Sequence, residues 1–261
     1  MTTLATGTLA DVGIDAVALK PAEVDPARAV DLDVETLAVD YEGREHVPDC
    51  ETLATLTDHA EVRLTTPVRA DGYDPLGDDS ALDAVPEAVN RVLVAGHGAY
   101  LTATEAERAV APRLRAAAAD ATDPWVGTEG IERLAMAVGG TQYELLSRST
   151  DRDLRALRAA GFDGEVAVYA PLVLTGDDDA VLDAVGDYAA RRRPVREALP
   201  DDARTDSAAT GRARDVLEQA VRDYALVGRP ETVADRTEQL RDAGADTVVG
   251  YPARGLGPLL G

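Results

Sequence analysis

The chain has 261 residues, 45% of them hydrophobic, which is enough to bury a full core. Its 48 acidic and 26 basic residues give a formal net charge of −22, and such a surface repels nucleic acids and anionic membranes. No segment approaches the ~20 apolar residues that span a bilayer, and no N-terminal run resembles a signal peptide. We therefore expect a folded cytoplasmic protein with a single domain over residues 1–261 and a small-molecule partner.

The basic residues are unusual in kind. Lys20 is the single lysine, and every other basic residue is arginine. An acid-rich, lysine-poor surface is typical of proteins from salt-loving archaea, where dense salt screens the repulsion between carboxylates. The single cysteine, Cys50, excludes an internal disulfide and fits a reducing compartment.

Short runs rich in valine and leucine predict eight strands, at residues 14–19, 34–39, 61–68, 92–95, 125–127, 143–146, 166–174 and 245–250. Between them, Ala-, Arg- and acid-rich segments predict helices, the first a short one opening at Asp25-Pro26, followed by 49–59, 80–89, 104–119, 131–138, 151–160 and 231–243. A helical excursion is expected around residues 178–224, interrupted near 200–207.

Strands that alternate with helices predict a parallel sheet, and eight repeats favour closure into a (β/α)8 TIM barrel. The length is near the ~250 residues typical of that α/β fold. The alternative is an open, doubly wound sheet. No GxGxxG motif follows the first strand, which disfavours the dinucleotide-binding version of that alternative.

Four strings, in matching order, resemble the luciferase-like flavin- and F420-dependent oxidoreductases, in particular the methylenetetrahydromethanopterin reductase branch. Residues 226–252, LVGRPETVADRTEQLRDAGADTVVGYP, are similar to the family's closing VGTPEEV…AGVDEVV…P pattern. Residues 89–98, VNRVLVAGHG, resemble its fourth strand, and residues 126–140, VGTEGIERLAMAVGG, resemble its GAQGPKMLELAGEIADG unit. Residues 49–68 resemble the helix and third strand that read VTLAAIALATNKIKLGPGV.

The resemblance implies F420 or FMN as the cofactor, lying across the C-terminal mouth of the barrel. It places the cofactor phosphate at a turn formed by Gly127, Thr128 and Gly130, and the ring near Thr65, Thr66, Pro67, Gly96 and Gly98. At residues 65–67 it implies a strand bulge, and the Thr66–Pro67 bond could be cis because X–Pro bonds adopt cis cheaply. The same glycines could instead make only a tight turn, and Glu129 would repel a phosphate.

The chain departs from the family where carboxylates are expected. Ala99 or Tyr100 stands where an Asp follows the fourth strand, and residues 18–20 offer no counterpart to a Glu on the first strand. The family's long insertion over the mouth is absent or short. Either the chemistry has changed, or the barrel has lost its redox cofactor and serves as a binding or regulatory protein.

Two residues are candidates for catalysis because they follow predicted strands. Lys20 could bind an anion or form a Schiff base in a lyase-type barrel, or it could be an ordinary surface lysine. His97 could act as an acid or base, or could simply be bonded to loop backbone. Other polar residues expected at strand ends include Asp40, Tyr169 and Tyr251.

The sequence also offers an anion site. Its arginine candidates at the mouth are Arg44, Arg69, Arg148 and Arg254. No metal is expected, because the spacing of His46 relative to Glu42, Glu45 and Asp49 matches no zinc motif. The leading interpretation is an F420- or flavin-dependent oxidoreductase that transfers hydride to a small substrate, with a homo-oligomer compatible with the sequence.

Overall fold

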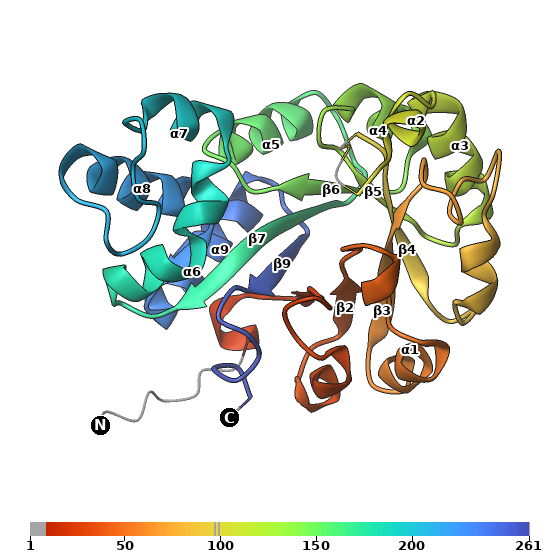
Figure 1. The fold of residues 1–261 in the computed structure, drawn as a ribbon, viewed down its shortest axis with the longest axis horizontal. Helices are drawn as coiled ribbons and strands as arrows, with labels where there is room; N and C mark the ends of the chain where they lie inside the picture. The colour runs from red at the N-terminus through yellow and green to blue at the C-terminus, as the bar shows by residue number, and fades with distance from the viewer. Residues whose placement is uncertain (1–8, 97, 99, 261) are drawn as a thin grey trace.

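The computed structural model describes residues 9–96, 98 and 100–260 (Figure 1). Its strands are β1 (Ala16–Leu19), β2 (Thr36–Val39), β3 (Glu61–Pro67), β4 (Asn90–Val94), β5 (Trp125–Gly127), β6 (Thr141–Leu145), β7 (Val166–Leu174), β8 (Leu226–Gly228) and β9 (Thr247–Pro252). Its helices are α1 (Cys50–Thr57), α2 (Ala103–Ala106), α3 (Val110–Asp120), α4 (Glu132–Val138), α5 (Thr150–Ala159), α6 (Asp178–Ala190), α7 (Arg193–Ala198), α8 (Gly211–Tyr224) and α9 (Pro230–Ala243). Short 3-10 helices are η1 (Ala10–Val12), η2 (Pro26–Asp31), η3 (Arg44–His46) and η4 (Ser80–Ala84).

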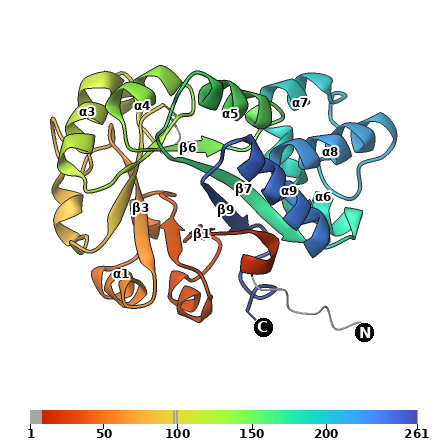
Figure 2. The ribbon, with the colours of Figure 1, turned by 180° about the vertical axis from the view of Figure 1, so that it is seen from behind.

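The sheet is a closed parallel barrel. Strands β1 to β6 pair in sequence order, β6 pairs with β7, and β7 pairs through β9 back to β1. β8 lies outside this ring, because it pairs only with the last three residues of β7. Eight strands therefore form the barrel, and helices cover its outer side (Figures 1 and 2). The fold is the predicted (β/α)8 TIM barrel, and the closed ring excludes the open-sheet alternative.

Each predicted strand is present within two residues at either end, and the ninth, β8, was not predicted. The helix predicted over 104–119 is two helices, α2 and α3, because Thr102 and Glu105 form a capping box that begins a separate short helix. The segment predicted as a helix over 80–89 is only the 3-10 turn η4. The excursion over 178–224 is helical, and α7 ends just before the predicted interruption near residue 200.

The barrel interior is filled by small and aromatic residues. The cluster is Ala16, Ala18, Ala38, Val92, Trp125, Tyr143, Ala167, Tyr169, Val249 and Tyr251. Because strand side chains alternate between faces, the intervening Val and Leu residues pack outward against the helices.

The N-terminal end of the barrel is sealed by a buried arginine. The Arg63 guanidinium lies 4.4 Å over the Trp125 ring. It donates hydrogen bonds to the carbonyl and the carboxylate of Asp123, at 2.7 and 3.1 Å. These contacts leave the opposite, C-terminal end as the place for a ligand.

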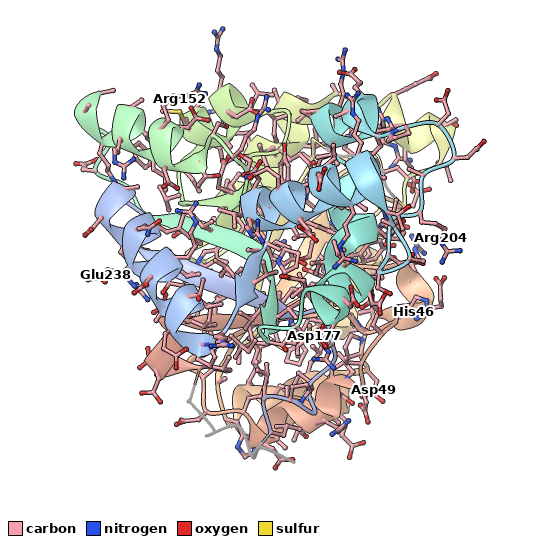
Figure 3. The ribbon with its side chains drawn as sticks, turned by 90° about the vertical axis from the view of Figure 1, so that its left-hand side faces the viewer. His46, Asp49, Arg152, Asp177, Arg204 and Glu238 are labelled. Carbon is pink, nitrogen blue, oxygen red and sulfur yellow. The ribbon has the colours of Figure 1, made fainter. Side chains whose placement is uncertain are left out.

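Helices α6, α7 and α8 form a group at one side of the barrel, visible in teal to blue in Figures 1 and 2, with their own hydrophobic cluster. Charged side chains such as Arg152, Arg204 and Glu238 project outward from this side of the molecule (Figure 3). Within the described residues, no helix is long and apolar enough to cross a membrane.

Candidate functional site

A cavity of about 430 Å³ opens at the C-terminal ends of the barrel strands. This volume is within the ~300–1,000 Å³ common for small-molecule sites. Its walls come from β1 to β7, from the loops that follow them, and from the end of α6; they are formed by Lys20, Asp40, Tyr41, Glu42, Thr65, Val94, Tyr100, Gly127, Thr128, Glu129, Tyr143, Leu145, Tyr169, Tyr188, Arg191 and Arg192. We refer to it as the mouth cavity.

Asp40 follows β2 directly, so its side chain reaches the floor of the mouth cavity. Its carboxylate accepts long hydrogen bonds from Tyr169 OH at 3.4 Å and Thr65 Oγ1 at 3.5 Å. Burial raises the pKa of the Asp40 carboxyl to about 7, and the charge of nearby Lys20 acts in the opposite direction. Asp40 can therefore exchange a proton near neutral pH.

Aromatic rings form a continuous row beside Asp40. Trp125 stacks on Tyr143 at 5.5 Å, Tyr143 meets Tyr169 edge-on at 5.9 Å, and Tyr169 stacks parallel to Tyr251 at 6.4 Å. Burial raises the pKa values of Tyr143 and Tyr169 well above the ordinary value, so both phenols stay protonated. They offer the cavity an apolar wall with hydroxyl donors on it.

Lys20 ends at the cavity, as the sequence predicts for a residue that follows the first strand. Its ammonium lies 4.0 Å over the Tyr251 ring and 3.6 Å from Glu23 Oε1. Tyr251 in turn donates a hydrogen bond to Glu23. These contacts hold Lys20 as a fixed positive charge at the rim.

The turn from Gly127 to Gly130 also reaches the mouth cavity, through Gly127, Thr128 and Glu129. Thr128 is committed to the protein, because its hydroxyl donates to Glu144 Oε2 at 2.6 Å and its amide donates to the Tyr143 carbonyl at 3.1 Å. Gly130 has a φ of 72°, a conformation that other residues adopt only at a cost. Whether this turn binds a phosphate stays a prediction.

The third strand corrects one expectation. β3 pairs with β4 without interruption from Arg63 to Pro67, so the predicted bulge is absent. The described residues contain no cis peptide bond, so the Thr66–Pro67 bond is trans. Thr65 faces the cavity, whereas the fully buried Thr66 donates its hydroxyl to the Leu64 carbonyl. The strand is regular because alternation alone brings Thr65 to the mouth.

After β4 the loop approaches the glycine turn closely. A Cβ built on Gly96 would lie 1.8 Å from the Glu129 carbonyl oxygen, so only glycine fits there. Gly98 has open space around the corresponding position. His97, the second catalytic candidate, lies outside the described residues.

The four predicted arginines do not converge. Arg44 donates to the Asp71 carbonyl in a second cavity of about 680 Å³, which shares Tyr41, Glu42 and Tyr100 with the first. Buried Arg69 donates to the Ala106 carbonyl at 2.8 Å. Arg254 is exposed beyond β9, and exposed Arg148 borders a groove formed with α7 and α8.

Arg148 therefore provides a negative prediction. We expect Arg148→Gln to change the affinity for any mouth-cavity ligand by less than about twofold, because Arg148 is exposed and does not line the cavity, and water and salt screen exposed charges. Fluorescence titration of the variant at physiological ionic strength measures this. A tenfold loss would show that this groove and the mouth cavity act together.

The cations that do line the mouth cavity besides Lys20 are Arg191 and Arg192, which follow α6. Arg191 pairs with Asp187 at 2.7 Å, and Arg192 Nη1 lies 3.7 Å from Glu129 Oε1. The sequence analysis missed both, together with Tyr143 and Tyr188. Their positions depend on how the α6–α8 group packs on the barrel, which no local pattern indicates.

The described part of the chain holds no group of three or more His, Cys, Asp or Glu residues placed to bind an ion. The charged residues of the mouth cavity are paired or hydrogen-bonded with protein groups. The cavity combines an ionisable carboxyl on its floor with cations on its rim.

Solved structures that share this fold include two F420-dependent enzymes. An F420-dependent secondary alcohol dehydrogenase, in complex with an F420–acetone adduct, has a TM-score of 0.63 and 11% identity over 95% of this chain and 96% of that one. The coenzyme F420-dependent tetrahydromethanopterin reductase from Methanopyrus kandleri has a TM-score of 0.53 and 15% identity over 94% of each chain. Apo-MsnO8 has a TM-score of 0.56 and 16% identity, covering 95% and 97%.

At these identities the likeness establishes the fold. No curated protein sequence matches the chain. A family model does match, over residues 9–259, and its description is a family of unknown function, DUF7388. Because this match spans nearly the whole length, the chain belongs to the DUF7388 family.

Proposed function

We propose that this protein is a deazaflavin-dependent oxidoreductase that uses F420 and acts on a small organic substrate. The observation that carries the proposal is Asp40, a carboxyl with a pKa of about 7 on the floor of a 430 Å³ cavity at the barrel mouth. The F420-dependent enzymes that share this fold support the choice of cofactor. FMN is the alternative cofactor.

The residues present fit such a cofactor. Val94, Leu145 and the Tyr143 ring give the cavity apolar surface for a flat ring. The Tyr143 hydroxyl is buried and has no hydrogen-bond partner among the described residues, so it can bond to a polar ring edge. Thr65, Gly127 and Thr128, which the sequence analysis assigned to the ring and the phosphate, also line the cavity. When bound, the deazaflavin supplies the hydride acceptor or donor.

Asp40 would handle the proton that accompanies hydride transfer. In alcohol oxidation, the substrate hydroxyl gives its proton to the Asp40 carboxylate as the carbon loses hydride; in the reverse reaction, the protonated carboxyl returns the proton to the forming alkoxide. The bonds from Tyr169 and Thr65 orient the carboxylate, and Lys20 favours its charged form. A pKa near the working pH suits both directions.

The test is anaerobic titration of the purified protein with F420 and, separately, with FMN, following cofactor fluorescence in high salt. We expect saturable micromolar binding of F420 and weaker binding of FMN. Tighter FMN binding would reassign the cofactor. If the folded protein binds neither, the oxidoreductase proposal is wrong.

Borohydride trapping tests the lyase alternative if the titration finds no cofactor binding. If borohydride then links a carbonyl compound to Lys20, the protein would be a lyase. The Lys20 ammonium is held against Tyr251 and Glu23, contacts that a neutral amine would lose, so we expect no trapping.

A further inference from the structure

Two buried polar atoms in the walls of the mouth cavity lack hydrogen-bond partners among the described residues. They are the Tyr143 hydroxyl and Arg192 Nε. Tyr143 is more than nine-tenths buried, so water does not readily satisfy its hydroxyl. A buried donor without a partner costs free energy, and that cost is recovered when a ligand supplies an acceptor.

Two tyrosines hold the Arg192 side chain in place, but its carboxylate partner is too distant for a hydrogen bond. Its guanidinium lies 4.5 Å over the Tyr188 ring and 5.8 Å from the Tyr224 ring, and it donates a hydrogen bond to Tyr188 OH. Its carboxylate partner, Glu129, lies 3.7 Å away, beyond hydrogen-bond distance, and keeps 46% of its side chain exposed. A ligand oxyanion could therefore replace Glu129 without moving the arginine.

Arg192 and Tyr143 belong to one wall. Tyr188, the ring beneath Arg192, is close enough to Tyr143 and Tyr169 to influence their ionisation. Asp40 influences the ionisation of Tyr188 in turn, and all of these residues line the same cavity. The wall thus combines the guanidinium of Arg192 with the neutral hydroxyl donor of Tyr143. This combination suits a ligand with an anionic oxygen group and a second acceptor oxygen.

We propose that Arg192 and Tyr143 form an oxyanion subsite of the mouth cavity, with Glu129 as a displaceable counterion. The group bound is a carboxylate or a phosphate, carried by the substrate or by the cofactor; only the identity of that molecule rests on the proposed function. The bland alternative is that Arg192 and Glu129 merely tie the end of α6 to the glycine turn.

The subsite is tested first with simple anions. Inorganic phosphate and acetate are titrated at constant ionic strength, following the fluorescence of Trp125, the single tryptophan, which stacks on Tyr143. Arg192→Gln should weaken binding at least tenfold and Tyr143→Phe about threefold. Glu129→Gln should strengthen it at least threefold, because the competing carboxylate is gone. Arg193→Gln, which alters an exposed arginine that pairs with Glu197 and does not line the cavity, should change it less than twofold.

Glu129→Gln keeps the test decisive, since it removes no buried contact, and thermal melting verifies that each variant is folded. If neither anion binds the wild-type protein, or if Glu129→Gln binds no more tightly and Arg192→Gln no more weakly than wild type, the subsite proposal is wrong. Equal losses in Arg193→Gln and Arg192→Gln would also overturn it, because a diffuse positive potential would then explain the binding.

The source of the anion is tested with F420 and its phosphate-free ring fragment. If the cofactor phosphate occupies the subsite, F420 binds to wild type more tightly than the fragment does. In Arg192→Gln, F420 and the fragment then bind with equal affinity. If a substrate carboxylate occupies it, the two cofactor forms keep their ratio in Arg192→Gln, and acetate still binds wild type with F420 present. Anion binding by a protein that binds neither F420 nor the fragment would sustain the subsite and refute the oxidoreductase.

Discussion

Asp40→Asn is expected to stabilise the protein at pH 8 while lowering turnover about 10²–10⁴-fold, the range typical for loss of a general acid or base. Burial raises the pKa of the Asp40 carboxyl from 3.8 to about 7, which corresponds to ~4 kcal/mol of differential interaction. The asparagine keeps the shape of the side chain and removes the partly buried charge. Cofactor affinity should change little, because the amide can still occupy the same position.

The sign of the change in the free energy of unfolding follows from proton linkage. The folded protein binds the Asp40 proton more tightly than the unfolded chain does, so this group's contribution falls as pH rises from about 4 to about 7. Above pH 7 the full cost of the partly buried carboxylate is present; near pH 4 it is absent. Asp40→Asn should therefore raise the free energy of unfolding by roughly 2–4 kcal/mol at pH 8 and leave it nearly unchanged at pH 4.

Urea unfolding of both proteins at pH 4, 6 and 8 measures this difference. A suitable control is Asp78→Asn, which replaces an exposed carboxylate bonded to Ser80 and should not stabilise the protein at pH 8. An Asp40→Asn variant with the same stability as wild type at every pH would show that folding does not raise the pKa of the Asp40 carboxyl. The proton-transfer role would then lose its basis.

The barrel could be predicted because its strands have a clear sequence pattern. Strands buried on both faces are short Val- and Leu-rich runs, as in Val166–Leu174. Eight such runs separated by helix-forming segments leave few alternative folds. β8 escaped because it has only three residues and borders the end of α8. The break between α2 and α3 did have a signal: Pro112 lies in the first turn of α3, where proline is tolerated, but would interrupt a helix that began at 104.

The site was predictable only in part. The rule that ligands bind at C-terminal strand ends finds Lys20, Asp40, Thr65 and Tyr169, which all line the cavity. It cannot show that burial raises the pKa of Asp40 or that the Tyr143 hydroxyl lacks a hydrogen-bond partner among the described residues. Both properties depend on contacts between distant parts of the chain. Arg192 comes from the α6–α8 group, and its approach to Glu129 is a tertiary contact between segments more than 60 residues apart.

Gly96→Ala is expected to destabilise the protein by about 3 kcal/mol and to weaken cofactor binding. The added methyl group would lie 1.8 Å from the Glu129 carbonyl oxygen, and a backbone atom cannot rotate away as a side-chain tip can. Either the loop after β4 or the glycine turn must move. Because the turn carries Glu129 and Thr128 into the mouth cavity, the cavity changes shape with it.

Two neighbouring glycines give matched controls for this effect. Gly98→Ala adds a methyl group in open space and should change the unfolding free energy by less than about 0.5 kcal/mol. Gly130→Ala also meets no atom, but its φ of 72° should cost about 1–2 kcal/mol. Urea unfolding and F420 titration of the three variants would test this order. If Gly96→Ala were as stable as Gly98→Ala, the close approach between loop and turn would be wrong, and with it the position of Glu129 beside Arg192.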